Sequence, residues 1–181
     1  QRLRDLHVRY GYAYRDFAIL YRTNAQSRSL EEALRRGGIP YRVVGGLSFY
    51  QRKEVKDVLA YLRLLVNPHD AASLQRVINY PARGIGQRTI EELMAFAQRH
   101  GLSLWQALER VEEVGLPART QKALQDFHFL IARHAARMQT VPVDELVRDL
   151  VVESGLLEEL QREGTPEALA RWENVQELLN A

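Results

Sequence analysis

The stretch 80–90 reads YPARGIGQRTI, and it predicts a tight corner between two helices. Gly84 and Gly86 flank Ile85, an apolar residue that can anchor the turn in a core. A helix is expected over about 87–99, so free backbone N–H groups should lie next to the glycine turn. Main-chain donors in this arrangement form a site for an anion.

Basic side chains stand on both sides of this corner. Arg83 precedes the glycines, and Arg88 follows them together with Thr89 at the helix start. Both arginines would reinforce an anion site built from main-chain amides. A helix-hairpin-helix loop grips DNA phosphate in this way without reading base sequence. Many helix–helix corners that bind nothing also contain a Gly-x-Gly, so the spacing alone leaves both interpretations open.

Upstream of the corner, the sequence predicts a strand–helix–strand unit. The runs DFAILYR (16–22) and IPYRVVGG (39–46) are short, apolar and β-rich, which is typical of buried strands. Between them, TNAQSRSLEEALRRGG (23–38) predicts a helix that Thr23 or Asn24 can cap and that Gly37-Gly38 ends. Short connections predict a parallel βαβ pair, and two strands alone suggest a piece of a larger sheet.

The rest of the chain is expected to be helical. Asp70 can start a short helix, and breaks at glycine and proline separate the others, with a further break possible at Ser154-Gly155. The predicted helices are 54–67, 87–99, 103–114, 117–138, 142–162 and 165–180. The expected fold is mainly α: a short βαβ fragment followed by an all-helical domain with a helix-hairpin-helix-like loop.

Composition narrows the class of protein. The chain has 181 residues, 46% of them hydrophobic, and no cysteine, so a packed core is expected and thiol chemistry is excluded. No apolar run approaches the roughly 20 residues of a membrane span, and we expect a soluble, cytoplasmic protein. Residues 1–100 hold 17 Lys+Arg against 9 Asp+Glu, whereas residues 101–181 hold 8 against 14. A basic front half suggests a polyanionic partner there.

Two further stretches contain candidate binding residues. Tyr21 and Arg22 end the first predicted strand, where ligands gather in open α/β sheets, and could stack on a base and neutralise phosphate. The stretch VVGGLSFYQRKEVKD (43–57) combines glycines, aromatics and basic residues at a turn-to-helix junction. Its candidate contacts to nucleic acid are Gly45, Gly46, Phe49, Arg52 and Lys56. Taken alone, this stretch favours aromatics packed under the helix and solvated basic residues.

Several catalytic patterns are absent from the sequence. It contains no G-x-x-x-x-G-K-[ST] phosphate loop, no H-E-x-x-H and no G-x-S-x-G, and its five histidines show no ligand spacing. No complete catalytic site and no metal site is therefore expected.

Three stretches in order resemble the UvrD/PcrA/Rep family of superfamily 1 DNA helicases, and the UvrD/PcrA branch in particular. They are FAILYRTNAQSRSLEEAL (17–34), VVGGLSFYQRKEVKDVLAYLRLLVNPHD (43–70) and RVINYPARGIGQRTIEEL (76–93), with a weaker fourth in RWENVQELLNA (171–181). The resemblance implies part of a larger ATP-dependent motor with RecA-like domains 1A and 2A and helical insertions 1B and 2B. Residues 1–50 would be a partial RecA-like 2A segment with helicase motif IV, and residues 51–181 the helical 2B domain.

The resemblance also implies roles for the candidate residues. Tyr21 would stack on the adenine of ATP, and Arg22 would reach its γ-phosphate as an arginine finger. The 43–57 stretch would lie near single-stranded DNA. The corner around Gly84-Ile85-Gly86, with Arg83, Arg88 and Thr89, would grip the duplex.

The chain departs from the family pattern in lacking the Walker motifs and the later motifs of 2A. We therefore expect ATP and Mg²⁺ to act only in the full-length enzyme, and this chain alone to be inactive as an ATPase. The expected partners are duplex and forked DNA, single-stranded DNA in the full enzyme, the remaining helicase domains, and no membrane. A second hypothesis is a protein-interaction module whose acidic helices (101–181) dock repair or transcription proteins.

Overall fold

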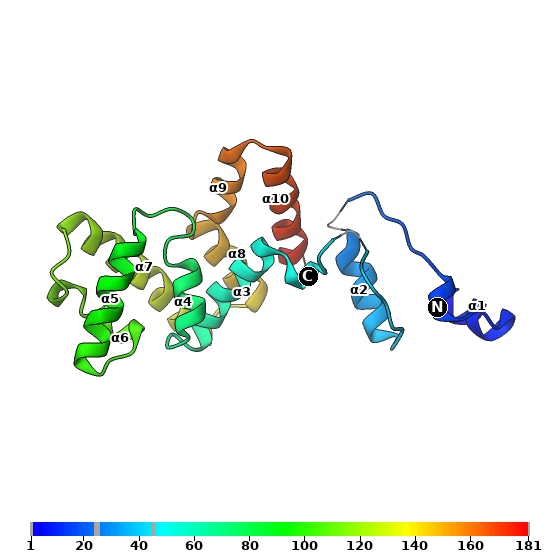
Figure 1. Cartoon of the computed structure of the whole chain (residues 1–181), viewed down its shortest axis with the longest axis horizontal. Coiled ribbons are helices and arrows are strands. Elements are labelled where there is room, and N and C mark those ends of the chain that lie inside the picture. The colour runs from blue at the N-terminus through cyan, green and yellow to red at the C-terminus, as the bar shows by residue number, and fades with distance from the viewer. Residues whose placement is uncertain (1, 24–25, 45, 181) are drawn as a thin grey trace.

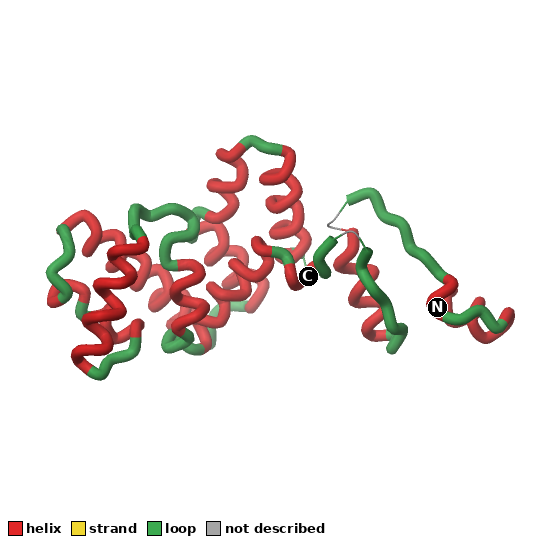
Figure 2. Tube along the Cα trace, in the orientation of Figure 1, coloured by secondary structure: helices red, strands yellow, loops and turns green. Residues whose placement is uncertain are grey.

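The computed structural model describes residues 2–23, 26–44 and 46–180, and in these ranges it contains ten α-helices and no strand. Figure 1 shows their arrangement, and Figure 2 shows helices joined by loops throughout. The helices are α1 Arg2–Tyr10, α2 Ser27–Arg36, α3 Lys53–Val66, α4 Ala71–Val77, α5 Gln87–His100, α6 Leu104–Glu109, α7 Ala118–Arg137, α8 Val143–Glu153, α9 Leu156–Glu163 and α10 Pro166–Leu179. Short 3-10 turns lie at η1 Tyr14–Asp16, η3 Phe49–Gln51 and η4 Val111–Glu113.

The two predicted strands are wrong as secondary structure in the part of the chain that the structure describes. Segments 16–22 and 39–44 form no strand, and among the described residues no backbone hydrogen bond joins one to the other. A strand exists only as part of a ladder, because each strand needs a partner for its N–H and C=O groups. The predicted burial is not found either, because Leu20 is 94% and Val44 77% exposed among these residues. The described chain supplies no partner strand that would cover the two segments.

The predicted helix boundaries in the rest of the chain are mostly confirmed. Helices α5, α7 and α10 begin and end within one residue of the predicted ranges. The stretch 142–162 does divide at Ser154-Gly155, where Gly155 has a φ of 80° that favours glycine. The stretch 103–114 is shorter than predicted, because α6 ends at Glu109 and a 3-10 turn follows.

Helix α3 lies at the centre of the helical domain and contributes to two hydrophobic cores. Tyr61 and Leu64 are fully buried in the larger core, which α3 to α8 build together. Val58 belongs to a smaller core whose other buried members come from α8, α9 and α10. Val66, which shares the helical spacing of these apolar residues, is exposed instead. Helix α3 is therefore buried on more than one face and connects the two cores.

The N-terminal part of the chain lies beside this helical domain (Figure 1), with α2 next to the end of α10 and α1 farther away. Helix α2 starts after Gln26, so Thr23 is not its cap, and Asn24 lies outside the described residues. Gly37 and Gly38 end it as predicted, Gly38 with a φ of 62°. None of the described helices is both long and apolar enough to cross a bilayer.

Candidate nucleic-acid interface and nucleotide contact

The corner between α4 and α5 is held by the side chain of Asn79. Its Oδ1 accepts hydrogen bonds from the backbone N–H groups of Arg83, at 2.8 Å, and of Ile85, at 3.0 Å. The Ile85 side chain is fully buried in the larger core, as its place in the sequence predicted. Gly84 has a φ of 75°, a conformation that favours glycine. The corner is therefore a turn held in shape by side-chain hydrogen bonds, and its two glycines remain at the surface.

The start of α5 is open to a ligand. Gly86 is its N-cap and has no side chain to accept from the first-turn N–H groups, and no acidic residue lies in that turn. Gln87 and Arg88 are exposed, and Thr89 is half-buried. Uncapped N–H groups and the positive end of the helix dipole together attract an anion. The structure thus places Gly86, Arg88 and Thr89 at the start of one helix.

The Arg88 side chain is 91% exposed and pairs with Glu92 one turn later, with 2.9 Å between Nε and Oε1. An exposed pair of this kind contributes little to stability and exchanges readily for another anion. Arg88 is therefore positioned to contact a phosphate next to the α5 N-terminus.

Arg83 requires a correction, because its guanidinium turns inward instead of reinforcing the anion site. Its Nη2 donates to the Tyr61 hydroxyl at 2.7 Å and to the Ser154 carbonyl at 3.0 Å, and Nη1 donates to the Val77 carbonyl at 3.1 Å. The guanidinium also lies over the ring of Phe127, 5.3 Å from its centroid. Arg83 therefore fastens the α4–α5 corner to α3, to α7 and to the corner between α8 and α9. The sequence could not show which of the two arginines turns inward, because the direction of each side chain depends on the residues that pack behind the turn.

The predicted DNA contacts in the 43–57 stretch include both buried and exposed residues in the structure. Phe49 is 0% exposed and Arg52 is 7% exposed, so neither presents a surface to a nucleic acid. Gly46 and Lys56 are exposed, and Gly45 lies outside the described residues. Arg52 and Lys56 are four positions apart, but they differ because Arg52 is the N-cap of α3 and turns into the protein. Of this group, Gly46 and Lys56 remain candidates.

Arg52 belongs to a buried polar junction that the sequence analysis missed. Its Nη1 donates to Asn174 Oδ1 at 2.7 Å and its Nη2 to Ser27 Oγ at 2.8 Å. Asn174 in turn donates from Nδ2 to Glu54 Oε1 at 2.6 Å. Asn174 lies 122 positions from Arg52 and 120 from Glu54, so only the tertiary structure reveals the network. The one local signal is Asn174, which stands beside Val175 and near Trp172 on a helix whose buried residues also include Ala168 and Leu179.

A second set of polar contacts joins α2 to the same region. Arg28 donates from Nη1 to the Glu177 carbonyl at 2.7 Å and from Nε to Glu32 at 2.9 Å. Glu31 accepts from the Phe49 N–H at 2.9 Å and from the hydroxyls of Tyr41 and Ser48. Burial raises the pKa of Glu31, but these hydrogen bonds outweigh it and hold the pKa below the ordinary 4.5.

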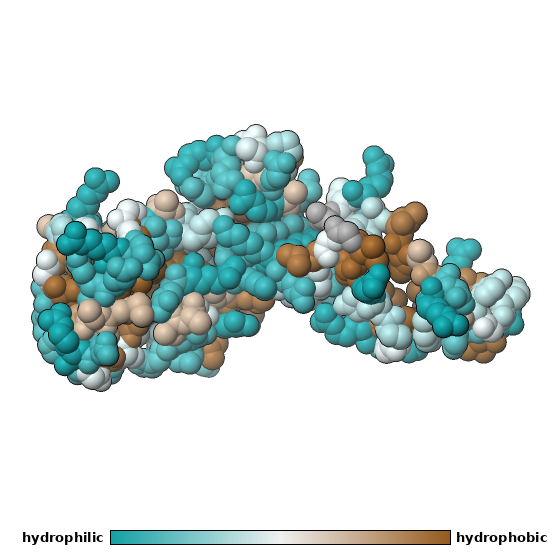
Figure 3. Space-filling model, viewed as in Figure 1, coloured by the Kyte–Doolittle hydropathy of each residue, from teal (hydrophilic) through white to brown (hydrophobic). Residues whose placement is uncertain are grey.

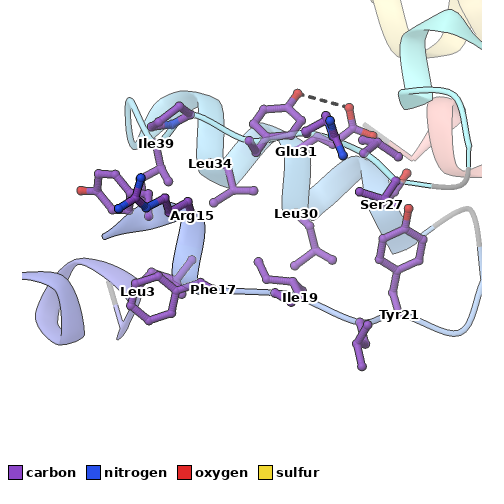
Figure 4. Close-up of a pocket in the computed structure, with 18 of the residues that line it drawn as sticks. Leu3, Arg15, Phe17, Ile19, Tyr21, Ser27, Leu30, Glu31, Leu34 and Ile39 are labelled. Atoms are coloured by element: carbon purple, nitrogen blue, oxygen red, sulfur yellow. Dashed lines mark hydrogen bonds between the residues drawn. The ribbon is translucent and has the colours of Figure 1, made fainter. Parts of the chain in front are cut away.

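Tyr21 lines a cleft of about 850 Å³ beside α2, and Arg22 is the next residue in the chain. Figure 4 shows Tyr21 near Ser27, with Leu30 and Leu34 of α2 facing Ile19 and Phe17 across the cleft. Tyr21 is half-buried and Arg22 exposed. The backbone N–H groups of Arg22 and Thr23 both donate to Gln26 Oε1, at 3.0 and 3.3 Å. The loop with the two candidate nucleotide contacts is thereby tied to the start of α2.

The sequence that forms the corner, the junction and the loop at the cleft matches one known family of proteins. Residues 2–180 match the family described as the UvrD-like helicase C-terminal domain, and the chain belongs to that family. The match confirms the resemblance to UvrD/PcrA-type helicases that the three quoted stretches indicated.

The chain is similar over most of its length to individual helicases. It is 41% identical over 174 residues to the ATP-dependent DNA helicase PcrA of Staphylococcus aureus and 40% identical over 174 residues to PcrA of Staphylococcus epidermidis. Each alignment covers 96% of this chain and 24% of the relative. The chain thus spans about a quarter of the length of the curated relatives that it matches.

Proposed function

We propose that this chain is a segment of an ATP-dependent 3′–5′ DNA helicase, with the start of domain 2A and most of domain 2B. In the complete enzyme it grips the duplex through the α4–α5 corner and contributes Tyr21 and Arg22 to the nucleotide site. The observation that supports duplex binding most directly is the uncapped N-terminus of α5 beside the exposed Arg88. Backbone amides and one guanidinium recognise phosphate regardless of base sequence.

The nucleotide role rests on a different part of the molecule. Tyr21 offers a half-buried ring and Arg22 an exposed guanidinium from a loop that Gln26 holds in place. The Tyr21 ring suits a contact to a base, and the Arg22 guanidinium suits a contact to a phosphate. Among the described residues, no cluster of acidic side chains or histidines could hold a metal ion. ATP with Mg²⁺ would supply the β–γ phosphoanhydride bond, whose hydrolysis transfers the γ-phosphoryl group to water and releases ADP. The residues of this chain would stack against the base and neutralise charge on the phosphate.

The cleft beside α2 supports the assignment of residues 1–50 to a partial 2A domain. Leu20 is 94% exposed and Val44 77% exposed, and Figure 3 shows hydrophobic residues gathered on this side of the molecule. Exposed apolar chain of this extent marks a surface that other structure covers. In the complete helicase the remaining strands of 2A would pair with segments 16–22 and 39–46.

The duplex-binding proposal is tested best at Gly86. An added Cβ there meets nothing within 4 Å, and the φ of −77° suits any residue. Gly86→Asp should therefore fold, accept the first-turn N–H groups of α5 and repel phosphate. We expect duplex affinity, measured by fluorescence anisotropy, to fall about tenfold or more, since charge-assisted contacts are lost. Gly86→Ala is the matched control and should bind like the unchanged chain; equal binding by Gly86→Asp would refute the proposal.

The protein-interaction alternative is supported by exposed carboxylates on the C-terminal helices. Asp144 and Glu145 in α8, Glu158 in α9 and Glu167 in α10 are all exposed. A basic partner could dock there by charge complementarity. Binding of a repair or transcription protein that survives Gly86→Asp but is lost on replacing these carboxylates would favour this function.

A further inference from the structure

The junction between the N-terminal part and the helical domain centres on Arg52. This arginine is 7% exposed and bridges two acceptors, Asn174 Oδ1 at 2.7 Å and Ser27 Oγ at 2.8 Å. Its guanidinium also lies 5.4 Å from the centroid of the Phe49 ring. A planar, forked cation suits this geometry, and a lysine could not reproduce both bonds.

One end of this arrangement reaches the candidate nucleotide loop. Ser27 is the first residue of α2, five positions after Arg22. The residue before it, Gln26, accepts the backbone N–H groups of Arg22 and Thr23. The bond from Arg52 to Ser27 therefore fixes the helix start against which the Arg22 loop is held.

The other end reaches the helical domain. Asn174, in α10, donates to Glu54 of α3 at 2.6 Å, and both residues are buried. A buried polar group that loses its partner costs considerably more than an exposed one, so each bond in the series constrains its neighbours. The series Glu54, Asn174, Arg52, Ser27 thus connects the central helix of the domain to the loop.

We propose that Arg52 and Asn174 are positioning residues that hold the Arg22 loop in place for nucleotide hydrolysis, an inference that rests on the proposed nucleotide role of Arg22. Neither residue touches the nucleotide. They act through Ser27 and Gln26, and the helical domain thereby sets the position of a side chain that faces the phosphate. Small displacements of a charge-stabilising group reduce the rate of a chemical step far more than they reduce binding.

The test uses the complete helicase that contains this chain, with steady-state ATPase kinetics for Arg52→Lys and Ser27→Ala. Arg52→Lys replaces the forked guanidinium by a single ammonium group. Ser27→Ala is the milder change, because it removes only one hydrogen-bond acceptor of Arg52. We expect kcat to fall about tenfold for Arg52→Lys and less for Ser27→Ala, with KM for ATP changed by less than about twofold. Tyr21→Ala should behave differently and raise KM, because stacking contributes to binding.

Asp57→Ala provides the matched control. Asp57 is also buried in α3 and pairs with Arg76 of α4 at 2.7 Å, on contacts that do not involve the loop. The Asp57→Ala substitution should lower thermal stability about as much as Arg52→Lys does, while it leaves kcat unchanged. Full kcat in both junction variants, a change confined to KM, or an equal loss of kcat in Asp57→Ala would each overturn the inference. Undiminished ATPase activity in Arg22→Ala would instead refute the nucleotide role itself.

Discussion

At the scale of single residues, Arg83 and Arg88 show how two similar side chains around one turn acquire different tasks. Arg83 donates to groups of α3 and of the α8–α9 corner and lies over the Phe127 ring, whereas Arg88 has only an exposed partner. The first is part of the packing that shapes the corner, and the second is free to exchange its partner. Replacing both at once would mix loss of structure with loss of binding.

Single substitutions should separate the two tasks. Arg83→Ala leaves several acceptors unpaired, so we expect the free energy of unfolding to fall by about 2–3 kcal/mol. Arg88→Ala should change it by less than about 0.5 kcal/mol, as expected for an exposed side chain. Arg88→Ala should nevertheless weaken duplex binding severalfold. Urea denaturation and fluorescence anisotropy on both variants measure these effects, and equal stability of the two would contradict the assignment.

At the scale of elements, α2 has an unusual distribution of side chains. Its buried residues are polar: Ser27, Arg28 and Glu31. Its leucines, Leu30 and Leu34, instead line the cleft. The helix is therefore attached to the helical domain through hydrogen bonds, and its apolar face is left for other structure. Such an attachment depends on the charge of its buried carboxylate.

Acid should weaken the attachment of α2. The pKa of Glu31 is lower in the folded protein than its ordinary 4.5, so ionised Glu31 stabilises the fold above that pH. This stabilisation is lost as the pH falls through the lowered pKa. We expect Glu31→Gln to speed hydrogen–deuterium exchange in α2 at pH 7, with the difference shrinking as the pH falls through the lowered pKa of Glu31. The exposed Glu145→Gln should show no such change, and a pH-independent difference would contradict the role of Glu31.

At the scale of the whole molecule, only some of the basic residues remain available to contact DNA. The basic residues concentrate in the first 100 positions, but Arg28, Arg52 and Arg83 are used within the fold. The surface left for DNA is therefore smaller than the count of arginines suggests. Duplex binding by this chain should involve few phosphates.

The salt dependence of binding measures that number. With about two or three phosphate contacts, log affinity should fall against log salt with a slope of about −1.8 to −2.7. This corresponds to about 10- to 40-fold weaker binding between about 50 and 200 mM salt. Anisotropy titrations on forked, duplex and single-stranded DNA give the slope for each. A slope near zero would show that phosphate contacts do not drive binding.

Local signals in the sequence predicted most of the helical domain. Glycines and prolines predicted where helices end, apolar spacing predicted α5, α7 and α10, and Ile85 was correctly assigned to the core. The pattern around Gly86 also predicted an open helix start with Arg88 beside it. These features depend on neighbours within a few positions, so sequence alone determines them.

Only the tertiary structure decided which polar side chains turn inward. Arg52 meets Asn174, and Arg83 meets Ser154, across separations of 122 and 71 residues. Likewise, segments 16–22 and 39–46 have the composition of strands, but a strand requires a partner at its edge. Burial of a charge and formation of a ladder both depend on what packs opposite, and that is set by residues far away in the chain.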